Sequence, residues 1–205
     1  ASSEADIRSL LDDYRALGIY RLMALRGDMP SGALENAGFT TAQQLVAYVR
    51  ELWGNNARIF VAAYPEVHPR AHTPAADLQA FRDKVAAGAT DAVTQYFYNV
   101  EAFLRFRDEA LALGIDVPIV PGIMPISNFN QLSRFSDACG AEIPRWLRKR
   151  LEALQDDLPA LCDYGADVVA GICERLIAEG VPALHFYSMN RADLIGELCK
   201  RLGWC

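Results

Sequence analysis

Short apolar runs alternate with helical patterns along this chain, and this alternation limits the folds that it can adopt. Five such runs occur, at Tyr20–Asp28, Arg58–Ala63, Asp91–Phe97, Val117–Val120 and Ala183–Tyr187. Each is too short for a lone helix and is bounded by turn residues, so each is interpreted as a buried strand. Strands that are separated by crossover helices pair in parallel, and the chain is therefore expected to be an α/β protein.

Helical patterns fill the intervals between these runs. Apolar residues recur at helical spacing over residues 3–17, 40–53, 73–87, 100–113, 127–138, 143–154, 158–178 and 191–202. Thr73 offers an N-cap with Pro74 in the first helical position. The tetrapeptide Ala-Leu-Gly-Ile occurs at 16–19 and again at 112–115, where a glycine ends a helix and leads into a strand.

Five strand–helix units with polar strand tips suit a (β/α)8 TIM barrel. Eight units take about 250 residues, so the 205 residues are expected to form a single partial barrel domain over 1–205 that contains strands four to eight. A doubly wound sheet is the alternative. No Gly-x-Gly-x-x-Gly follows any strand, so the dinucleotide-binding version of that fold has little support.

Composition excludes several classes of function. The net charge of -6 argues against nucleic-acid and membrane partners, and the one basic cluster, 145–150, is interpreted as a solvated helix face. No signal peptide or membrane span is visible, which favours a cytoplasmic location. The five cysteines lack zinc-ligand spacing, so they are expected to be reduced and no metal is expected.

The strand tips are rich in aromatic side chains and in groups that both donate and accept hydrogen bonds. They are Arg26-Gly27-Asp28, Tyr64 to Pro69, Gln95 to Asn99, Pro121 to Pro125 and Tyr187 to Arg191. Functional residues of a parallel barrel lie at these carboxyl ends. No cysteine nucleophile or Gly-x-Ser-x-Gly elbow is among them, and the set fits a planar, heteroaromatic ligand better than a peptide or an ester.

Five of these segments together resemble the methylenetetrahydrofolate reductase family. They are ALRGD at 24–28, AAYPEVHP at 62–69, TQYFYN at 94–99, PIVPGIMPISNF at 118–129 and LHFYSMNR at 184–191, in the family's order. The resemblance implies a (β/α)8 flavoprotein that binds FAD, takes hydride from NADH or NADPH and reduces 5,10-methylenetetrahydrofolate to 5-methyltetrahydrofolate, in one-carbon metabolism and methionine biosynthesis.

The resemblance also assigns cofactor residues. Those that match FAD contacts of the family are Arg26, Gly27, Asp28, Ala42, Tyr64, His68, Ala71, Asp77, Ala80 and Lys84. Asp28 matches the catalytic aspartate between flavin and pterin, where a carboxylate accepts hydrogen bonds from the pterin and disfavours anionic reduced flavin. Without the resemblance, Arg26 to Asp28 would be a salt-bridged turn, His68 an ordinary loop histidine, and Asp77 to Lys84 one face of an amphipathic helix.

The substrate residues that the resemblance implies are Asp28, Gln95, Phe135, Tyr187, Met189 and Arg191. The Gln95 amide donates and accepts together, which suits the edge of a pterin or of a nicotinamide carboxamide. Phe135 matches an aromatic that stacks on a ligand, although a core aromatic is an equal alternative for it. Arg191 suits the glutamate tail or benzoyl carbonyl of a folate.

The chain departs from the family in one important respect. The family's general-acid glutamate lies near the first barrel strand, in a Glu-Phe-Phe-Pro-Pro type motif that does not occur here. An inactive partial barrel that only self-associates is therefore an alternative, and bacterial members of the family are commonly oligomeric. An aldolase-like lyase is a third hypothesis, but Lys84, Lys149 and Lys200 all fall in predicted helices, not at strand tips.

Overall fold

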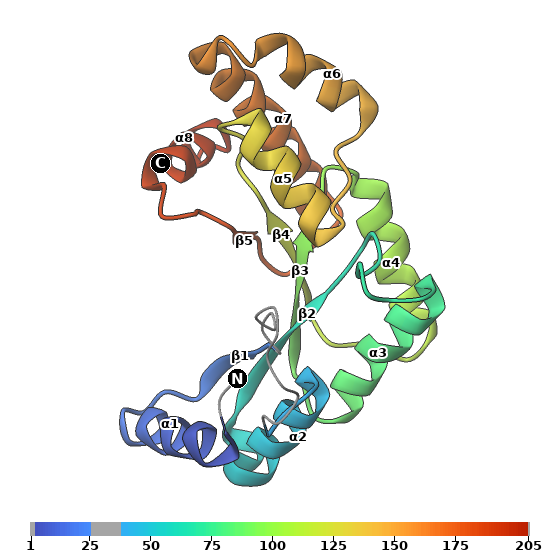
Figure 1. Cartoon of the computed structure of the whole chain (residues 1–205), viewed down its shortest axis with the longest axis vertical. Helices are drawn as coiled ribbons and strands as arrows, with labels where there is room; N and C mark the ends of the chain where they lie inside the picture. Colours follow the sequence, from blue (N-terminus) through green and yellow to red (C-terminus); the bar gives the residue numbers. More distant parts are fainter. Residues whose placement is uncertain (1–2, 26–37, 205) are drawn as a thin grey trace.

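A curled parallel sheet runs through the centre of the computed structural model, which describes residues 3–25 and 38–204. The sheet has five strands in the order β1-β2-β3-β4-β5, every neighbouring pair parallel. They are β1 (Arg21–Ala24), β2 (Arg58–Ala63), β3 (Asp91–Tyr96), β4 (Ile119–Ile123) and β5 (His185–Phe186). Within the described residues, β1 and β5 form the two unpaired edges of an open half-barrel (Figure 1).

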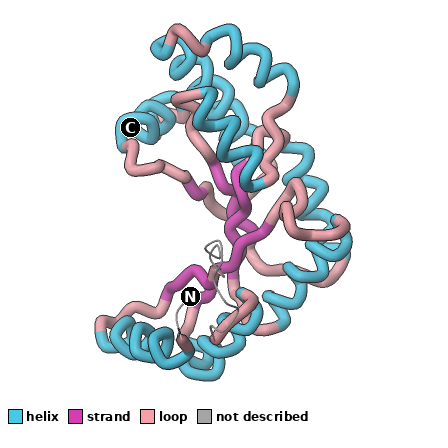
Figure 2. The backbone as a smooth tube through the Cα atoms, in the orientation of Figure 1, coloured by secondary structure: helices cyan, strands magenta, loops and turns pink. Residues whose placement is uncertain are grey.

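Helices surround this sheet (Figure 2). They are α1 (Glu4–Ala16), α2 (Ala42–Trp53), α3 (Pro74–Ala86), α4 (Val100–Ala112), α5 (Phe129–Cys139), α6 (Arg145–Leu154), α7 (Leu158–Ala178) and α8 (Ala192–Arg201). The layer on the outer, convex side of the sheet runs from α2 through α3 and α4 to α7, each helix packed on the next. This arrangement confirms the expected partial (β/α) barrel. None of the described helices combines the length and apolarity that a membrane span requires.

Local signals fix where these helices begin and end. The Thr73 hydroxyl accepts a hydrogen bond from the Ala76 N–H at 3.1 Å, with Pro74 in the first turn as predicted. The two Ala-Leu-Gly-Ile tetrapeptides have the same conformation, with φ of 72° at Gly18 and 76° at Gly114. In each, the isoleucine N–H reaches back to the last helical turn, so the chain leaves the helix in the direction of the next strand.

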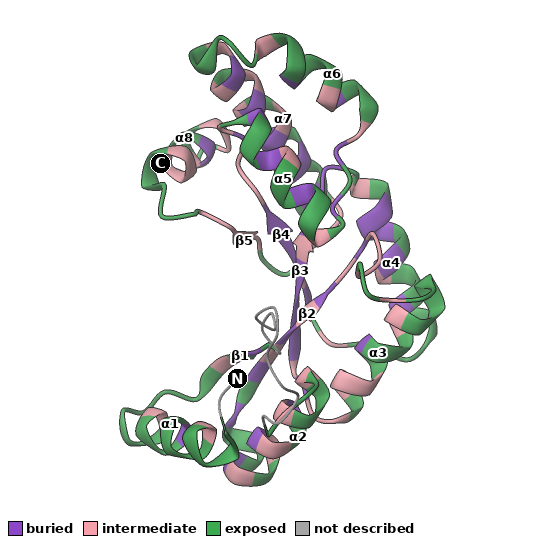
Figure 3. Cartoon of the chain, in the orientation of Figure 1, coloured by how far each residue is buried: buried purple, intermediate pink, exposed green. Residues whose placement is uncertain are grey.

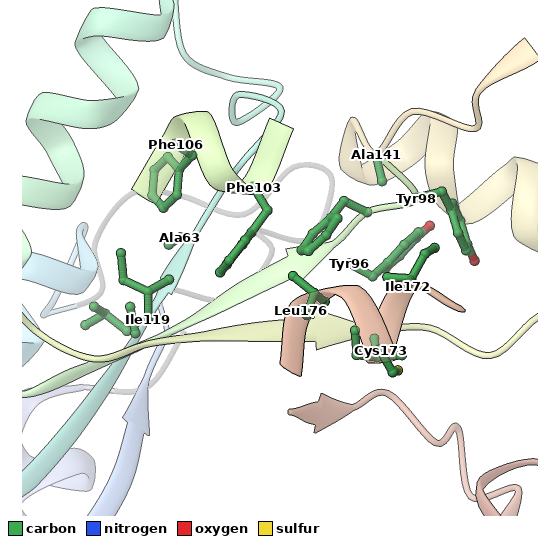
Figure 4. Close-up of a cluster of buried hydrophobic side chains, with 14 of the residues drawn as sticks. Ala63, Tyr96, Tyr98, Phe103, Phe106, Ile119, Ala141, Ile172, Cys173 and Leu176 are labelled. Carbon is green, nitrogen blue, oxygen red and sulfur yellow. The ribbon is translucent and has the colours of Figure 1, made fainter. Parts of the chain in front are cut away.

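The hydrophobic core lies between the sheet and the outer helices. Ile59, Val61 and Ala63 of β2 are buried against this layer, whereas the alternate residues of the strand are only partly covered on the concave side (Figure 3). Aromatic rings of α4 fill the space behind the strands (Figure 4), where Phe103 stacks on Phe97 with ring centroids 5.2 Å apart. β2 thus has one face that is packed and one that is partly open, whereas most residues of β3 are buried on both faces.

Several predicted strands differ from the structure at their ends. The fourth was predicted at Val117–Val120, with Pro121 and Gly122 in the tip after it, but β4 runs over Ile119–Ile123 and includes both. The ladder with β3 shifts register between Val93 and Tyr96, and there the Thr94 hydroxyl accepts the Gly122 N–H at 2.9 Å. Such an irregularity tolerates a proline inside a sheet, since the ladder does not need its missing N–H.

The fifth strand was predicted over Ala183–Tyr187, and only His185 and Phe186 pair with β4. The first run also forms a shorter strand than predicted, because β1 ends at Ala24. These differences move the ends of elements and leave their order unchanged.

Candidate functional site

The carboxyl ends of the parallel strands open into three adjoining pockets. The first, which we call the α3 pocket, has a volume of about 430 Å³ and lies between the ends of β1 and β2 and the helices α2 and α3. The central pocket, about 500 Å³, lies over β3 and α5. The α5 pocket, about 200 Å³, lies between α5 and the loop after β5. The sites of (β/α) barrels occupy this end of the strands.

The α3 pocket brings together residues from four separate segments of the chain. Seven residues of the cofactor set named above line it: Ala42, Tyr64, His68, Ala71, Asp77, Ala80 and Lys84. Alanines make up much of the lining, and at these positions a flat ligand can approach the backbone closely. No described residue of that set lies outside the pocket, although their roles as FAD contacts remain a proposal.

The loop between β2 and α3 is held by its own hydrogen bonds. The His68 N–H donates to the Asp77 carboxylate at 2.9 Å, and the His68 Nδ1 accepts the Arg70 N–H at 3.0 Å. Since Nδ1 is an acceptor, the neutral ring carries its hydrogen on Nε2. The Tyr64 and His68 rings meet edge to face with centroids 4.4 Å apart, which fixes both rings in the wall shared by the α3 and central pockets.

Lys84 places a cation inside the α3 pocket. Its Nζ donates to the carbonyl oxygen of Ala62 on β2 at 2.5 Å, which draws the side chain from α3 toward the strand. Burial lowers the pKa of Lys84 to about 8, partly offset by the carboxylate of Asp77. At neutral pH the group is therefore a charged donor that is poorly solvated and suited to an anionic partner.

The central pocket has amide, hydroxyl and thiol groups in its wall. Gln95 lines it, and its Oε1 accepts the Tyr96 N–H at 3.0 Å, so the amide NH₂ group can still donate to a ligand. The Tyr96 hydroxyl lies 3.0 Å from the Ser136 Oγ and accepts from the Cys139 thiol at 3.5 Å. Burial raises the pKa of Tyr96, which keeps this phenol neutral.

Phe135 and Met189 connect the central pocket with the α5 pocket, and both line the two of them. The Phe135 ring is 38% exposed, so it has an open face. Arg191 also lines the α5 pocket, where its guanidinium makes two hydrogen bonds to Asp193, at 3.0 and 2.7 Å. The Tyr187 hydroxyl donates to the Thr94 carbonyl at 2.9 Å, which leaves the ring as the part of this residue that a ligand can contact.

The remaining predicted residues, Arg26, Gly27 and Asp28, lie outside the described part of the chain. Leu25, the last described residue before them, lines both the α3 pocket and the central pocket. Leu25 therefore lies at the junction of the two pockets. Within residues 3–25 and 38–204, no group of three or more His, Cys, Asp or Glu side chains could hold a metal ion.

Sequence reasoning missed several lining residues, of which Gln131, Cys139 and Arg70 are the most polar or reactive. Gln131 and Cys139 each lie four residues from Phe135, so helical spacing alone puts them on its face of α5. Arg70 directly follows a tip that had been singled out. The sequence thus placed all three residues near predicted site residues, but periodicity alone does not show which face of a helix lines a pocket.

The fold and these pockets define a class of protein: a parallel α/β half-barrel with ligand-sized pockets at the carboxyl ends of its strands. The family model described as methylenetetrahydrofolate reductase matches residues 1–203. The chain belongs to the methylenetetrahydrofolate reductase family.

Several curated bacterial proteins named 5,10-methylenetetrahydrofolate reductase are similar to it. The Escherichia coli K12 protein is 41% identical over 198 residues, which cover 97% of this chain and 66% of that protein. The Pectobacterium carotovorum protein is 41% identical over 202 residues, with 98% and 66% covered, and a Buchnera aphidicola protein is 36% identical over 202 residues, with 98% and 68% covered. The chain thus spans about two thirds of the length of these relatives.

Among solved structures, a Clostridium thermocellum protein superposes with a TM-score of 0.57 at 20% sequence identity, covering 89% of this chain and 70% of that one. It is described as binding two copies of 5-methyl-5,6,7,8-tetrahydrofolic acid. At this identity the likeness concerns the fold.

Proposed function

We propose that this chain supplies the FAD and folate pockets of a methylenetetrahydrofolate reductase. The reaction reduces 5,10-methylenetetrahydrofolate to 5-methyltetrahydrofolate with hydride from NADH or NADPH, in one-carbon and methionine metabolism of the cytoplasm. Family membership and the names of the relatives support the activity. The Clostridium thermocellum protein, which shares the fold and is described as binding 5-methyl-5,6,7,8-tetrahydrofolic acid, supports a reduced folate as a ligand.

The observation that carries the proposal is the continuity of the pockets. The α3 pocket, lined by the cofactor set, shares Tyr64 and His68 with the central pocket, where Gln95 lies. The central pocket shares Phe135 and Met189 with the α5 pocket, where Arg191 lies. A flavin in the first and a folate across the other two would meet at the shared wall, which hydride transfer between stacked rings requires.

The residues of the α3 pocket fit FAD in both size and charge. The α3 and central pockets have volumes within the range of about 300–1,000 Å³ in which small ligands and cofactors are bound. Lys84, Arg70 and His72 supply cationic or donor groups for the diphosphate. The flat alanine walls let an isoalloxazine or adenine ring lie against the backbone.

The side chains of this chain bind and orient the reactants. The hydride transfer from the nicotinamide to the folate would be supplied by bound FAD. Tyr64 and His68 hold the ring edge, Gln95 pairs with the polar edge of the pterin or of the carboxamide, and Phe135 offers a face for stacking. Arg191, already oriented by Asp193, would bind the carboxylate tail of the folate.

A titration of the purified chain with FAD tests the proposal. Binding is monitored by flavin absorbance and fluorescence, and the same titration is made with a version extended upstream to its natural start. Lys84→Met is the matched variant and should weaken binding at least about tenfold, because a buried charged donor contributes about 1.5–3 kcal/mol. Lys149→Met, on the exposed side of α6, is the control.

Saturable binding by the short chain would mean that the Tyr64 and Lys84 side of the pocket is already formed in it. Binding by the extended version alone would mean that the pocket is completed by residues outside this chain. The absence of flavin binding in both would contradict the proposal and favour an inactive half-barrel that associates through the unpaired edges β1 and β5.

A further inference from the structure

Glu66 connects two segments that carry walls of the central pocket, and the proposed function assigns no role to this residue. It lies in the loop between β2 and α3, between Tyr64 and His68. Its Oε2 accepts the backbone N–H of Glu142, in the segment that links α5 to α6, at 2.8 Å. Its Oε1 is buried and has no hydrogen-bond partner among the described residues.

The contact between the loop after β2 and the end of α5, which we call the seam, is closely packed beside this hydrogen bond. Gly140, with φ of 75°, ends α5, and a Cβ built on it would lie 2.9 Å from the Pro69 Cγ and 3.5 Å from the Val67 carbonyl oxygen. The end of α5 therefore rests directly on the loop after β2. That loop carries Tyr64 and His68, and α5 carries Phe135 and Cys139, so the seam sets how far apart these two walls stand.

We propose that Glu66 is a positioning residue that fastens α5 to the loop after β2 and thereby sets the width of the central pocket, more firmly when its carboxyl group is protonated. The inference rests on the proposed function for the identity of the ligands. Its physical basis is that burial in this contact costs a carboxylate more free energy than it costs a neutral carboxyl group, and the Glu142 hydrogen bond offsets only part of that cost.

The surroundings of Glu66 place its protonation near neutral pH. Burial raises the pKa of Glu66 to about 7, and the Glu142 N–H partly offsets this rise. The charged groups that face it are the Glu142 carboxylate, which raises the pKa further, and Arg105 of α4, which lowers it. Tyr96 is close enough for the Glu66 charge to raise the pKa of its phenol.

An ionised Glu66 costs stability, which argues that it serves the pocket and not the fold. A glutamate whose pKa is raised on folding binds more protons in the folded state, so stability falls as the pH rises through about 7. Glu66→Gln keeps the size of the side chain and an oxygen that can accept the Glu142 N–H, but it removes the charge. Glu66→Ala removes the acceptor as well.

The Glu142 amide reports on this contact independently of any ligand. In a ¹H–¹⁵N titration from about pH 5.5 to about pH 8.5, its shift should move with a midpoint near the Glu66 pKa of about 7. The shift should stay constant in Glu66→Gln. It should still move in Glu142→Gln, which changes the neighbouring side chain but keeps the N–H. A constant shift in the unmodified chain, or one that still titrates in Glu66→Gln, would overturn the inference.

A second measurement tests the pocket itself, with 5-methyltetrahydrofolate as the probe and FAD as the internal comparison, in the extended protein. Folate affinity should fall about tenfold in Glu66→Ala, whereas FAD affinity should change less than about twofold, because most of the FAD site lies in the α3 pocket. The unmodified protein should bind folate more tightly below pH 7 than above it, and Glu66→Gln should lose that pH dependence.

The two hypotheses fail in different ways. If neither FAD nor folate binds to the unmodified protein, the proposed function is wrong and the Glu142 amide titration alone decides the role of Glu66. If both ligands bind and Glu66→Ala leaves folate affinity and its pH profile unchanged, Glu66 is not a positioning residue.

Discussion

Lys84 shows how a single residue can cost stability in return for a binding site. Burial lowers its pKa to about 8 from the ordinary lysine value of 10.5, so folding disfavours the charged form. The unfolded chain binds more protons than the folded one between these two values, and the free energy of unfolding therefore rises across that interval as the pH increases.

We expect Lys84→Met to increase the free energy of unfolding at pH 7 by roughly 1–3 kcal/mol while it weakens FAD binding. The gain should shrink toward pH 10, since the lysine is then neutral in the folded state. Urea unfolding at the two pH values measures both effects. A variant that is clearly less stable than the parent chain at pH 7 would show that the Ala62 contact matters more than burial of the charge.

Asp91 is a second residue whose charge matters, at the opposite end of the sheet. Its carboxylate is 2% exposed and accepts two hydrogen bonds from Arg58, at 2.8 and 2.6 Å, which join the starts of β2 and β3. The Arg58 hydrogen bond lowers the pKa of Asp91, so the stability that it contributes is present above the ordinary aspartate pKa of 3.8 and is lost as the pH falls through the lower folded value.

Asp91→Asn should therefore destabilise the chain at pH 7. Because Arg58 is half-exposed and water screens the pair, the loss should be limited to roughly 1–3 kcal/mol. The difference from the parent chain should decrease on acidification below about pH 4. Thermal unfolding across this range provides the measurement, with the exposed Asp108→Asn as the control. Equal losses for the two variants would argue against a special role for the buried pair.

At the scale of elements, the junction of β3 and β4 depends on the small size of Gly122. A Cβ there would lie 2.2 Å from the Thr94 carbonyl oxygen and 2.6 Å from the Tyr187 ring. The first of these atoms belongs to the backbone, so it cannot move aside cheaply. The same carbonyl accepts the Tyr187 hydroxyl, which ties β5 to the junction.

Gly122→Ala should reduce the free energy of unfolding by at least about 2 kcal/mol and disturb the α5 pocket, since Tyr187 must shift. Gly171→Ala is the matched control, because Gly171 lies in α7 with nothing within 4 Å of the added methyl group. That change should stabilise the chain by about 0.5–1 kcal/mol through helix propensity. Similar results for both variants would mean that the sheet adapts at Gly122.

At the scale of the whole molecule, the half-barrel leaves two strand edges without a partner among the described residues. Large apolar side chains are exposed on β1 and just before and after it: Leu17, Ile19, Tyr20, Met23 and Leu25. A free parallel edge with apolar neighbours is a surface on which a second strand can add.

We expect the chain to self-associate as its concentration rises, and Met23→Lys to reduce this association, since a charged side chain at an edge strand opposes pairing. Sedimentation velocity over a concentration series measures the effect. Leu111→Lys, on the exposed side of α4, should leave association unchanged. The edge hypothesis would be wrong if the two variants behaved alike.

The sequence alone predicted most of the local structure of this chain. It determined the order of strands and helices, the full extent of β2 and α7, and the helix ends at Thr73, Gly18 and Gly114, because caps, glycine stops and periodicity act over a few residues. The family resemblance proposed a cofactor set, and the described members of that set all line one pocket.

Only the tertiary structure decided what depends on contacts between distant segments. The extension of β4 through Pro121 requires the Thr94 side chain of β3, and no local pattern specifies it. The buried charge of Lys84 and the seam at Glu66 arise where helices meet strands and loops far away in sequence. The periodicity of the sequence defines the apolar and polar faces of a helix. Tertiary packing decides which face lines a pocket and which polar groups are desolvated.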